Sequence, residues 1–87
     1  MNHHHRKVLH AIFSHPVNAN IDMKEIEHTL EALGAELETK SGSRLGISLN
    51  GHKIAVQHVN HSVPKEEVIQ IRKFLETCGV AAADYPV

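Results

Sequence analysis

The segment GSRLGISLNGHKIAVQHVNH, residues 42–61, decides the fold, because it predicts a β-hairpin whose register can be derived directly. Asn50-Gly51 is typical of a two-residue type I′ turn, in which both residues have positive φ. With these two residues as the loop, the strands pair outward from the turn until Ser43 lies opposite His58. The alternation of side chains along both strands agrees with this register.

The two faces of this hairpin differ in character. Apolar side chains share one face: Leu45, Ile47, Leu49, Ile54 and Val56. Polar and basic side chains share the other: Arg44, Ser48, Lys53 and Gln57. The apolar face predicts a wall of the core, because a slip by one residue would expose all of it. The polar face has nothing in the hairpin to cover it, so we expect a functional surface there.

Length and composition limit the class of protein. A chain of 87 residues, 41% hydrophobic and 22% charged, predicts one small globular domain. Two Phe, one Tyr and no Trp are too few for a base-stacking RNA platform. The single cysteine, Cys78, excludes an intrachain disulfide and fits a reducing, cytoplasmic setting. No segment has the length of a membrane span or the pattern of a secretion signal.

Charge is unevenly distributed along a chain whose net charge is −1. Residues 22–38 are rich in Asp and Glu, with Lys24 as the one basic residue. Residues 39–65 contain no acidic residue. The basic side chains in that stretch are Lys40, Arg44, Lys53 and Lys65, together with His52, His58 and His61. The hairpin therefore predicts a local positive patch that suits phosphate, and a solvated sheet face without a ligand is the alternative.

Two helices are expected before the sheet. Apolar residues at helical spacing predict a first helix over residues 5–14, which ends before Pro16. Asp22 is a good N-cap for a second helix, and Glu25 completes a capping-box pattern. Gly34 is a natural residue to terminate that helix.

The rest of the chain completes an α+β fold. Residues 35–40 predict a first strand that leads into the hairpin. A last helix runs from Pro64 to Gly79, and residues 81–87 form a loose tail. The expected order is α-α-β-β-β-α. It gives a three-stranded antiparallel sheet with helices packed on one face and the other face open.

Residues 21–80 resemble the HicA family of bacterial toxins. The matching stretches are LEALGAELE (30–38), GSR (42–44), the hairpin with its His-x-x-His exit (58–61), and PKEEVIQIRKFLETCGV (64–80). The resemblance implies a fold similar to the double-stranded-RNA-binding domain. It also implies that the chain is a single domain, in which residues 1–20 are an added helix and loop and residues 81–87 are a flexible tail.

The resemblance further implies a function. HicA proteins are small ribonucleases that cleave messenger RNA without a metal, and a partner antitoxin called HicB masks their site. We therefore expect RNA and a HicB-like antitoxin as partners, with no cofactor and no membrane. The chain departs from the family at Arg44, where the family has the histidine that is identified with catalysis. Arginine keeps a positive charge for phosphate, but it stays protonated at physiological pH and is a poor general base.

RNA cleavage without a metal requires a base for the 2′-OH, an acid for the leaving 5′-oxygen, and positive charge near the phosphorus. Histidine suits the first two tasks, so His58 and His61 are the candidates to replace the missing histidine, with Arg44 as a third catalytic candidate. The candidate RNA-binding residues are Lys40, Ser43, Arg44, Lys53, Gln57 and Lys65. The alternatives are a half-buried structural histidine for His58 and a loop residue near a helix start for His61.

Other interpretations remain beside this one. His58 and His61 could supply two metal ligands, but no CxxC or carboxylate pair stands at a supporting spacing, so no metal is expected. Cys78 falls on the apolar stripe of the last helix and is expected to be a small buried hydrophobe. The rival function is a non-catalytic RNA- or protein-binding module that has kept the fold but lost the catalytic histidine.

Overall fold

The computed structural model describes residues 1–16, 21–40 and 42–86. Its elements are α1 (His3–Ile12), α2 (Met23–Ala32), β1 (Glu36–Lys40), β2 (Arg44–Leu49), β3 (His52–Gln57), α3 (Lys65–Thr77) and the short 3-10 helix η1 (Ala82–Asp84). The strands form one antiparallel sheet in the order β1-β2-β3. The predicted α+β class and the order α-α-β-β-β-α are confirmed.

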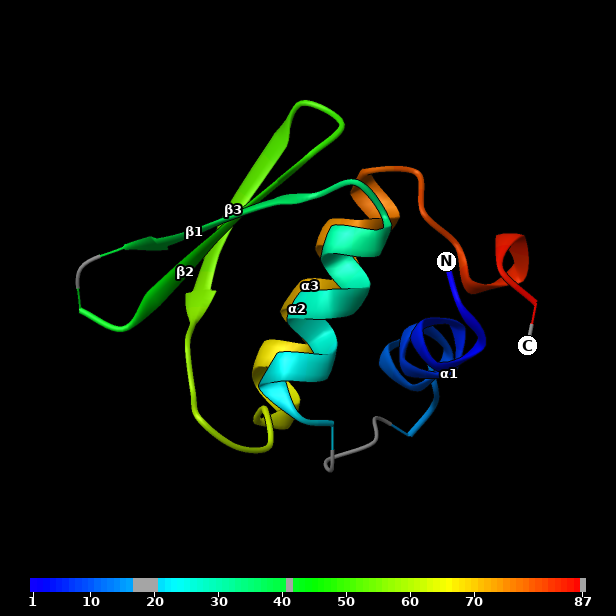
Figure 1. The fold of residues 1–87 in the computed structure, drawn as a ribbon, viewed down its shortest axis with the longest axis horizontal. Coiled ribbons are helices and arrows are strands. Elements are labelled where there is room, and N and C mark those ends of the chain that lie inside the picture. The colour runs from blue at the N-terminus through cyan, green and yellow to red at the C-terminus, as the bar shows by residue number, and fades with distance from the viewer. Residues whose placement is uncertain (17–20, 41, 87) are drawn as a thin grey trace.

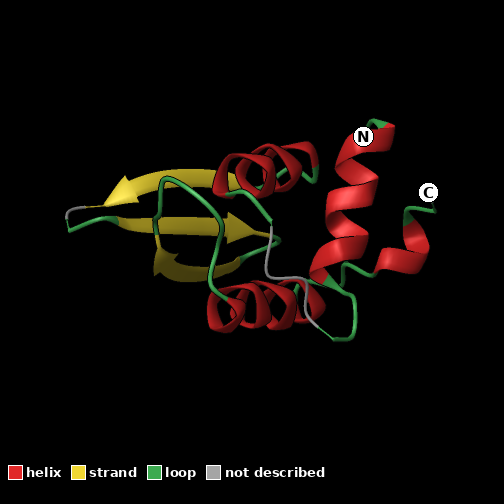
Figure 2. Ribbon diagram, turned by 90° about the horizontal axis from the view of Figure 1, so that it is seen from below, coloured by secondary structure: helices red, strands yellow, loops and turns green. Residues whose placement is uncertain are grey.

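The elements lie in three layers (Figure 1). The sheet forms one outer layer, and α2 and α3 form the middle layer, where α2 packs against β1 and α3 against β3. Helix α1 forms the third layer and packs on α2 and α3 on the side away from the sheet. Figure 2 shows that α1 runs across the direction of these two helices. The helices thus cover one face of the sheet and leave the other face open.

The predicted hairpin register is confirmed from the turn to the far end. Asn50 and Gly51 have φ values of 52° and 82°, as a type I′ turn requires. Leu49 pairs with His52 beside the turn. At the far end, the backbone N–H of His58 donates to the carbonyl oxygen of Ser43 at 2.8 Å.

The core lies between the sheet and the helices. The inward residues of the hairpin include Leu45, Ile47 and Val56, each 2% exposed or less. The helices present their apolar stripes to these residues: Met23, Ile26 and Leu30 from α2, and Val68, Ile71 and Leu75 from α3. Each such side chain contributes about 1.5–3 kcal/mol by leaving water. The alternation in the strands and the helical periodicity therefore define the same core.

Helix α2 begins as predicted, with one correction. The Asp22 side chain accepts a hydrogen bond from the backbone N–H of Lys24 at 2.9 Å, which confirms the N-cap. Glu25 does not complete a capping box. Its carboxylate instead contacts Nε2 of His4 at 3.0 Å, because α1 lies within reach of its side chain. The sequence pattern could not anticipate a competing partner from another helix.

Helix α1 begins two residues earlier than predicted because Asn2 caps it. The Asn2 side chain accepts a hydrogen bond from the backbone N–H of His5 at 2.8 Å. Two residues of α1, Leu9 and Ile12, are fully buried. Helix α1 is therefore part of the core.

The C-terminal segment differs from the loose tail that the sequence predicts. Ala82–Asp84 form η1, which packs against α1. His10 Nε2 donates to the carbonyl oxygen of Tyr85 at 2.8 Å, and the Tyr85 side chain packs against the core. Residue 87 lies outside the described residues. No helix within the described ranges has the length and apolar character needed to cross a bilayer.

Candidate nucleic-acid interface

Three polar side chains form a row at one end of the open sheet face. The register pairs Lys40 of β1 with Arg44 of β2, and Arg44 with Gln57 of β3. All three residues are exposed. Cross-strand neighbours on one face have Cβ atoms about 5 Å apart, so the two cations give this end of the face a local positive charge that suits phosphate. The structure thus brings together three of the residues that the sequence proposes for RNA.

The rest of the open face is less basic than the hairpin alone predicts. Strand β1 adds Glu36 and Glu38, which alternate with the inward Leu37 and are both exposed. Another proposed cation, Lys53, lies in the row of Glu36 and Ser48 rather than beside Arg44. The predicted positive patch is therefore confined to the end of the sheet that holds Lys40 and Arg44.

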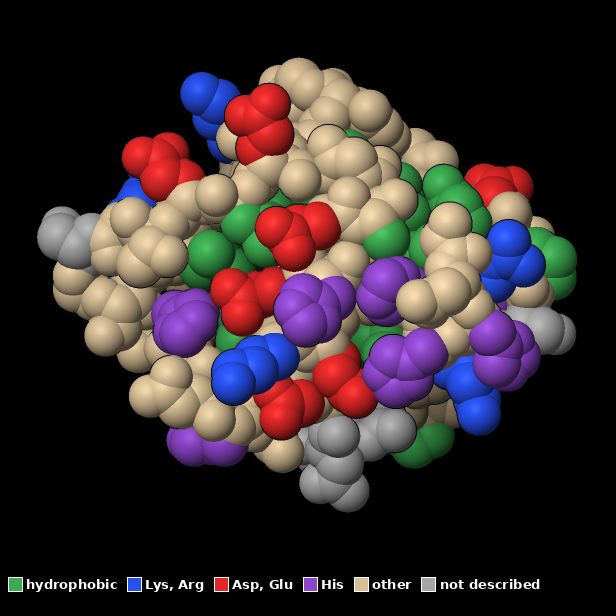
Figure 3. Space-filling model, viewed as in Figure 1, with side chains coloured by type: hydrophobic (Ala, Val, Ile, Leu, Met, Phe, Trp, Pro, Cys, Tyr) green, Lys and Arg blue, Asp and Glu red, His purple; other side chains and the backbone are tan. Residues whose placement is uncertain are grey.

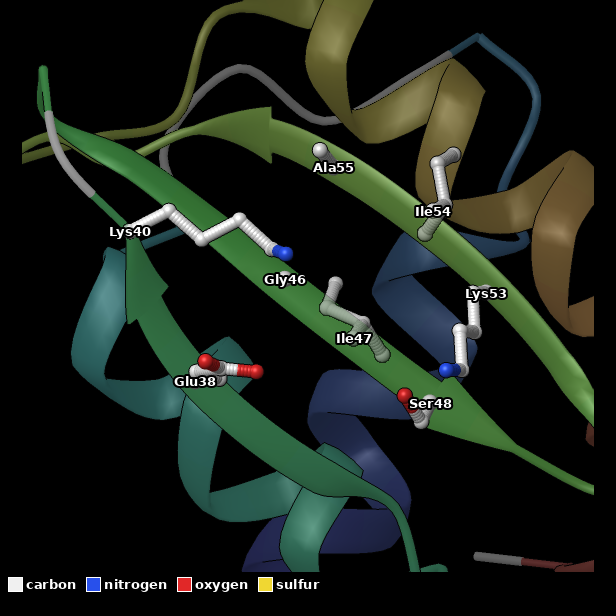
Figure 4. A pocket seen from close by; sticks show the side chains of 8 residues that line it. All are labelled: Glu38, Lys40, Gly46, Ile47, Ser48, Lys53, Ile54 and Ala55. Atoms are coloured by element: carbon white, nitrogen blue, oxygen red, sulfur yellow. The ribbon is translucent and has the colours of Figure 1, made fainter.

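A shallow hollow of about 260 Å³ lies beside this row (Figure 4). Its floor includes Gly46 and Ala55, which face each other across β2 and β3. Lys40 extends along the sheet over Gly46 (Figure 4). A Cβ added at Gly46 would lie 2.8 Å from Cε of Lys40. Glycine at this position therefore lets the Lys40 stem lie close to the sheet.

His58 lies on the other side of the sheet from Arg44. Its backbone continues β3, and its side chain follows the inward parity, as the sequence predicts. Its Nε2 atom lies 3.8 Å from a carboxylate oxygen of Glu27 in α2. The His58 and Glu27 side chains are 31% and 24% exposed, so the pair remains open to solvent. The geometry gives a histidine with a carboxylate partner at the edge of the helix layer.

The remaining proposed residues lie beside the start of α2, at the start of α3 and just before β2. The His61 carbonyl oxygen accepts a hydrogen bond from the backbone N–H of Met23 at 3.1 Å, which holds His61 beside the start of α2. Lys65 is exposed at the first position of α3. Ser43 is exposed with φ 61° and binds His58 through its backbone. The candidates thus form an open-face group and a helix-side group, which meet at Ser43.

Glu27 is the residue that the sequence interpretation missed. It stands four residues after Met23 and three before Leu30, so it falls within the apolar stripe of α2. A carboxylate inside such a stripe calls for a partner, because burial without one is costly. That position was the available signal, although the partner, His58 just after β3, becomes visible only in the folded chain.

Histidines also gather away from this end of the sheet. Figure 3 shows several of them among acidic side chains on the face that carries α1 and α2. Within the described residues, no group of three or more His, Cys, Asp or Glu side chains is arranged to hold a metal ion. Cys78 is buried, as predicted, and its thiol donates to the carbonyl oxygen of Leu49 at 3.3 Å. Burial raises the pKa of the Cys78 thiol, which makes it a poor nucleophile.

No family model, no curated protein and no solved structure matches this chain.

Proposed function

We propose that the chain acts on RNA as a HicA-like toxin, as a metal-independent mRNA endoribonuclease in the cytoplasm. One observation carries the enzymatic part of the proposal. His58 has a carboxylate partner, Glu27, at 3.8 Å, and it lies one residue pair from the row that contains Arg44. A carboxylate orients a histidine and stabilises its protonated form. The pair therefore supplies a candidate base one residue pair beyond the row of Arg44, on the helix side of the sheet.

The proposed reaction uses both groups of residues. Arg44 and Lys40 bind the phosphate from the open face, and the RNA strand passes around the end of the sheet to His58. His58 removes the proton of the 2′-OH, and the 2′-oxygen forms a bond to phosphorus. The bond from phosphorus to the 5′-oxygen breaks, and this oxygen takes a proton from His61. The products are a 2′,3′-cyclic phosphate and a free 5′-OH.

The test is cleavage of a fluorescent RNA in the presence of EDTA. Loss of a general base costs about a hundredfold or more in rate, so His58→Ala should abolish measurable cleavage. Glu27→Gln should lower the rate and leave RNA binding intact. His52→Ala is the matched control, because His52 lies on the same strand at the turn end of the hairpin. Cleavage by His58→Ala at the rate of the unaltered protein would reject the assignment.

A second candidate function is favoured by one feature of the site. The sheet separates Arg44 from His58, since the two side chains have opposite parity. This separation favours a non-catalytic module that binds RNA or protein at the end of the sheet. RNA binding without turnover in the same assay would select this alternative. The salt dependence of that binding then reports the number of phosphates contacted, and Arg44→Gln should reduce the slope by about one phosphate.

The proposal includes a HicB-like antitoxin that covers the open face. The hollow on this face is lined by a cationic side chain, Lys40, and an anionic one, Glu38, so an antitoxin could form ion pairs with both. An antitoxin at this site should protect Lys40 and Arg44 from chemical modification. Co-expression with a neighbouring HicB-like gene, followed by modification and mass spectrometry, tests this part.

A further inference from the structure

Strand β3 is an edge strand with unused backbone hydrogen-bonding groups. Within the described residues, β3 pairs with β2 on one side and with no strand on the other. The hydrogen bond from His58 to Ser43 fixes the phase of the antiparallel ladder. By alternation, the backbone N–H and C=O groups of Lys53, Ala55 and Gln57 point away from β2. An extended peptide can bind these groups as an additional strand.

A groove of about 400 Å³ lies beside this edge, between β3 and α3. Its apolar surface comes from Ile54 of β3 and Phe74 of α3. A strand added to β3 would direct every second side chain toward this groove and the others toward the open face. The groove thus suits an alternating sequence with small or medium apolar residues at every second position.

The groove is positively charged along its border. His52, Lys53 and Lys73 line it, and no carboxylate is found among the described residues that do so. The opposite edge of the sheet differs, because β1 carries Glu36 and Glu38. An acidic strand would therefore be attracted to β3 and repelled by β1.

We propose that this groove binds an extended, acidic segment of a partner protein, which adds to β3 as a fourth strand. Its apolar side chains lie over Ile54 and Phe74, and its carboxylates lie on the open face near Lys53. Lys73 at the groove border adds to the positive charge that attracts the segment. RNA fits less well, because it cannot continue a backbone ladder. A second copy fits less well, because β3 has no acidic side chain to meet Lys53 of the other copy. The inference does not depend on the proposed ribonuclease activity.

The probe is a labelled peptide of about eight residues in which glutamate and valine alternate, which is a typical strand length with its flanks. We expect saturable binding to the full chain by fluorescence anisotropy, with lower affinity at high salt. In amide NMR spectra, the signals of Lys53, Ala55 and Gln57 should shift. Those of Leu37 and Thr39, the outward positions of β1, should not. Absence of saturable binding, or equal binding of a lysine–valine peptide, would overturn the proposal.

Two variants test the site itself. Ala55→Pro removes an outward N–H without removing a bond of the β2–β3 ladder, and should weaken binding about tenfold or more. Thr39→Pro is the matched control at the outward edge of β1 and should bind as the unaltered chain does. Lys73→Glu changes charge on α3 and should also weaken binding, independently of any effect of proline on the strand. Unchanged affinity in Ala55→Pro and Lys73→Glu would refute the site.

Two further outcomes would assign the groove to a ligand other than a partner strand. RNA would be the occupant if it displaces the peptide from the unaltered chain but not from the Lys73→Glu variant. A concentration-dependent dimer that disappears in Ala55→Pro would assign it to a second copy. Either result overturns the proposal of a partner strand.

Discussion

Asn50 joins the tip of the hairpin to the end of α3, and its replacement should lower stability in two separable steps. The residue has φ 52°, in the left-handed region that a type I′ turn requires. Its Nδ2 atom donates to the carbonyl oxygen of Cys78 at 2.8 Å. Cys78 is the C-cap of α3, so this bond satisfies a carbonyl group at the helix end. The turn residue therefore has a local role and a long-range role.

The two roles predict different losses for two substitutions. Asn50→Gly keeps the backbone conformation and removes the hydrogen bond, which costs about 1 kcal/mol of the free energy of unfolding. Asn50→Ala removes the bond and also places a Cβ without a compensating side chain in the left-handed region, which adds about 1 kcal/mol. The expected total for Asn50→Ala is roughly 2 kcal/mol. For a domain of this size, each 1 kcal/mol lowers the Tm by about 4–8 °C.

The assay is urea and thermal unfolding followed by circular dichroism, with the three proteins at one pH. The proposed RNA binding should be unchanged in both variants, because Asn50 lies at the opposite end of the hairpin from Arg44. A loss below about 0.5 kcal/mol in both variants would show that the bond to Cys78 does not stabilise the fold. Equal losses in the two variants would instead show that the turn conformation imposes no separate cost on alanine.

Three other predictions concern the core. Leu9→Ala should destabilise the protein by about 2–5 kcal/mol, because Leu9 of α1 is fully buried. A urea midpoint close to that of the unaltered chain would contradict the three-layer core. Thr29→Val should raise the free energy of unfolding by about 1 kcal/mol, since the buried Thr29 hydroxyl has no hydrogen-bond partner among the described residues. A lower urea midpoint in the variant would refute this prediction. Burial raises the pKa of the Cys78 thiol above its ordinary value of 9.0, so the folded chain keeps this proton to higher pH than the unfolded chain does. Stability should therefore fall as the pH rises through the ordinary thiol range, and less so in Cys78→Ala, as urea midpoints from neutral to alkaline pH would show.

The candidate site was only partly visible in the sequence. Lys40, Arg44 and Gln57 could be placed on one face because alternation along paired strands is strict. Glu27 could not be paired with His58, because no local rule states which strand residue a helix side chain will meet. The sequence interpretation likewise left the acidic residues of β1 out of the open face.

The sequence by itself determined the hairpin, its register and the α+β class, because turn chemistry and the two periodicities are local signals. Asn50-Gly51 set the turn, and the strands then had one register that buries their apolar side chains. Only the tertiary structure decided the position of α1, the contact of His58 with Glu27, and the edge of β3 that pairs with no strand among the described residues. These features depend on how separate elements pack, and packing brings together residues whose separation along the chain carries no pattern.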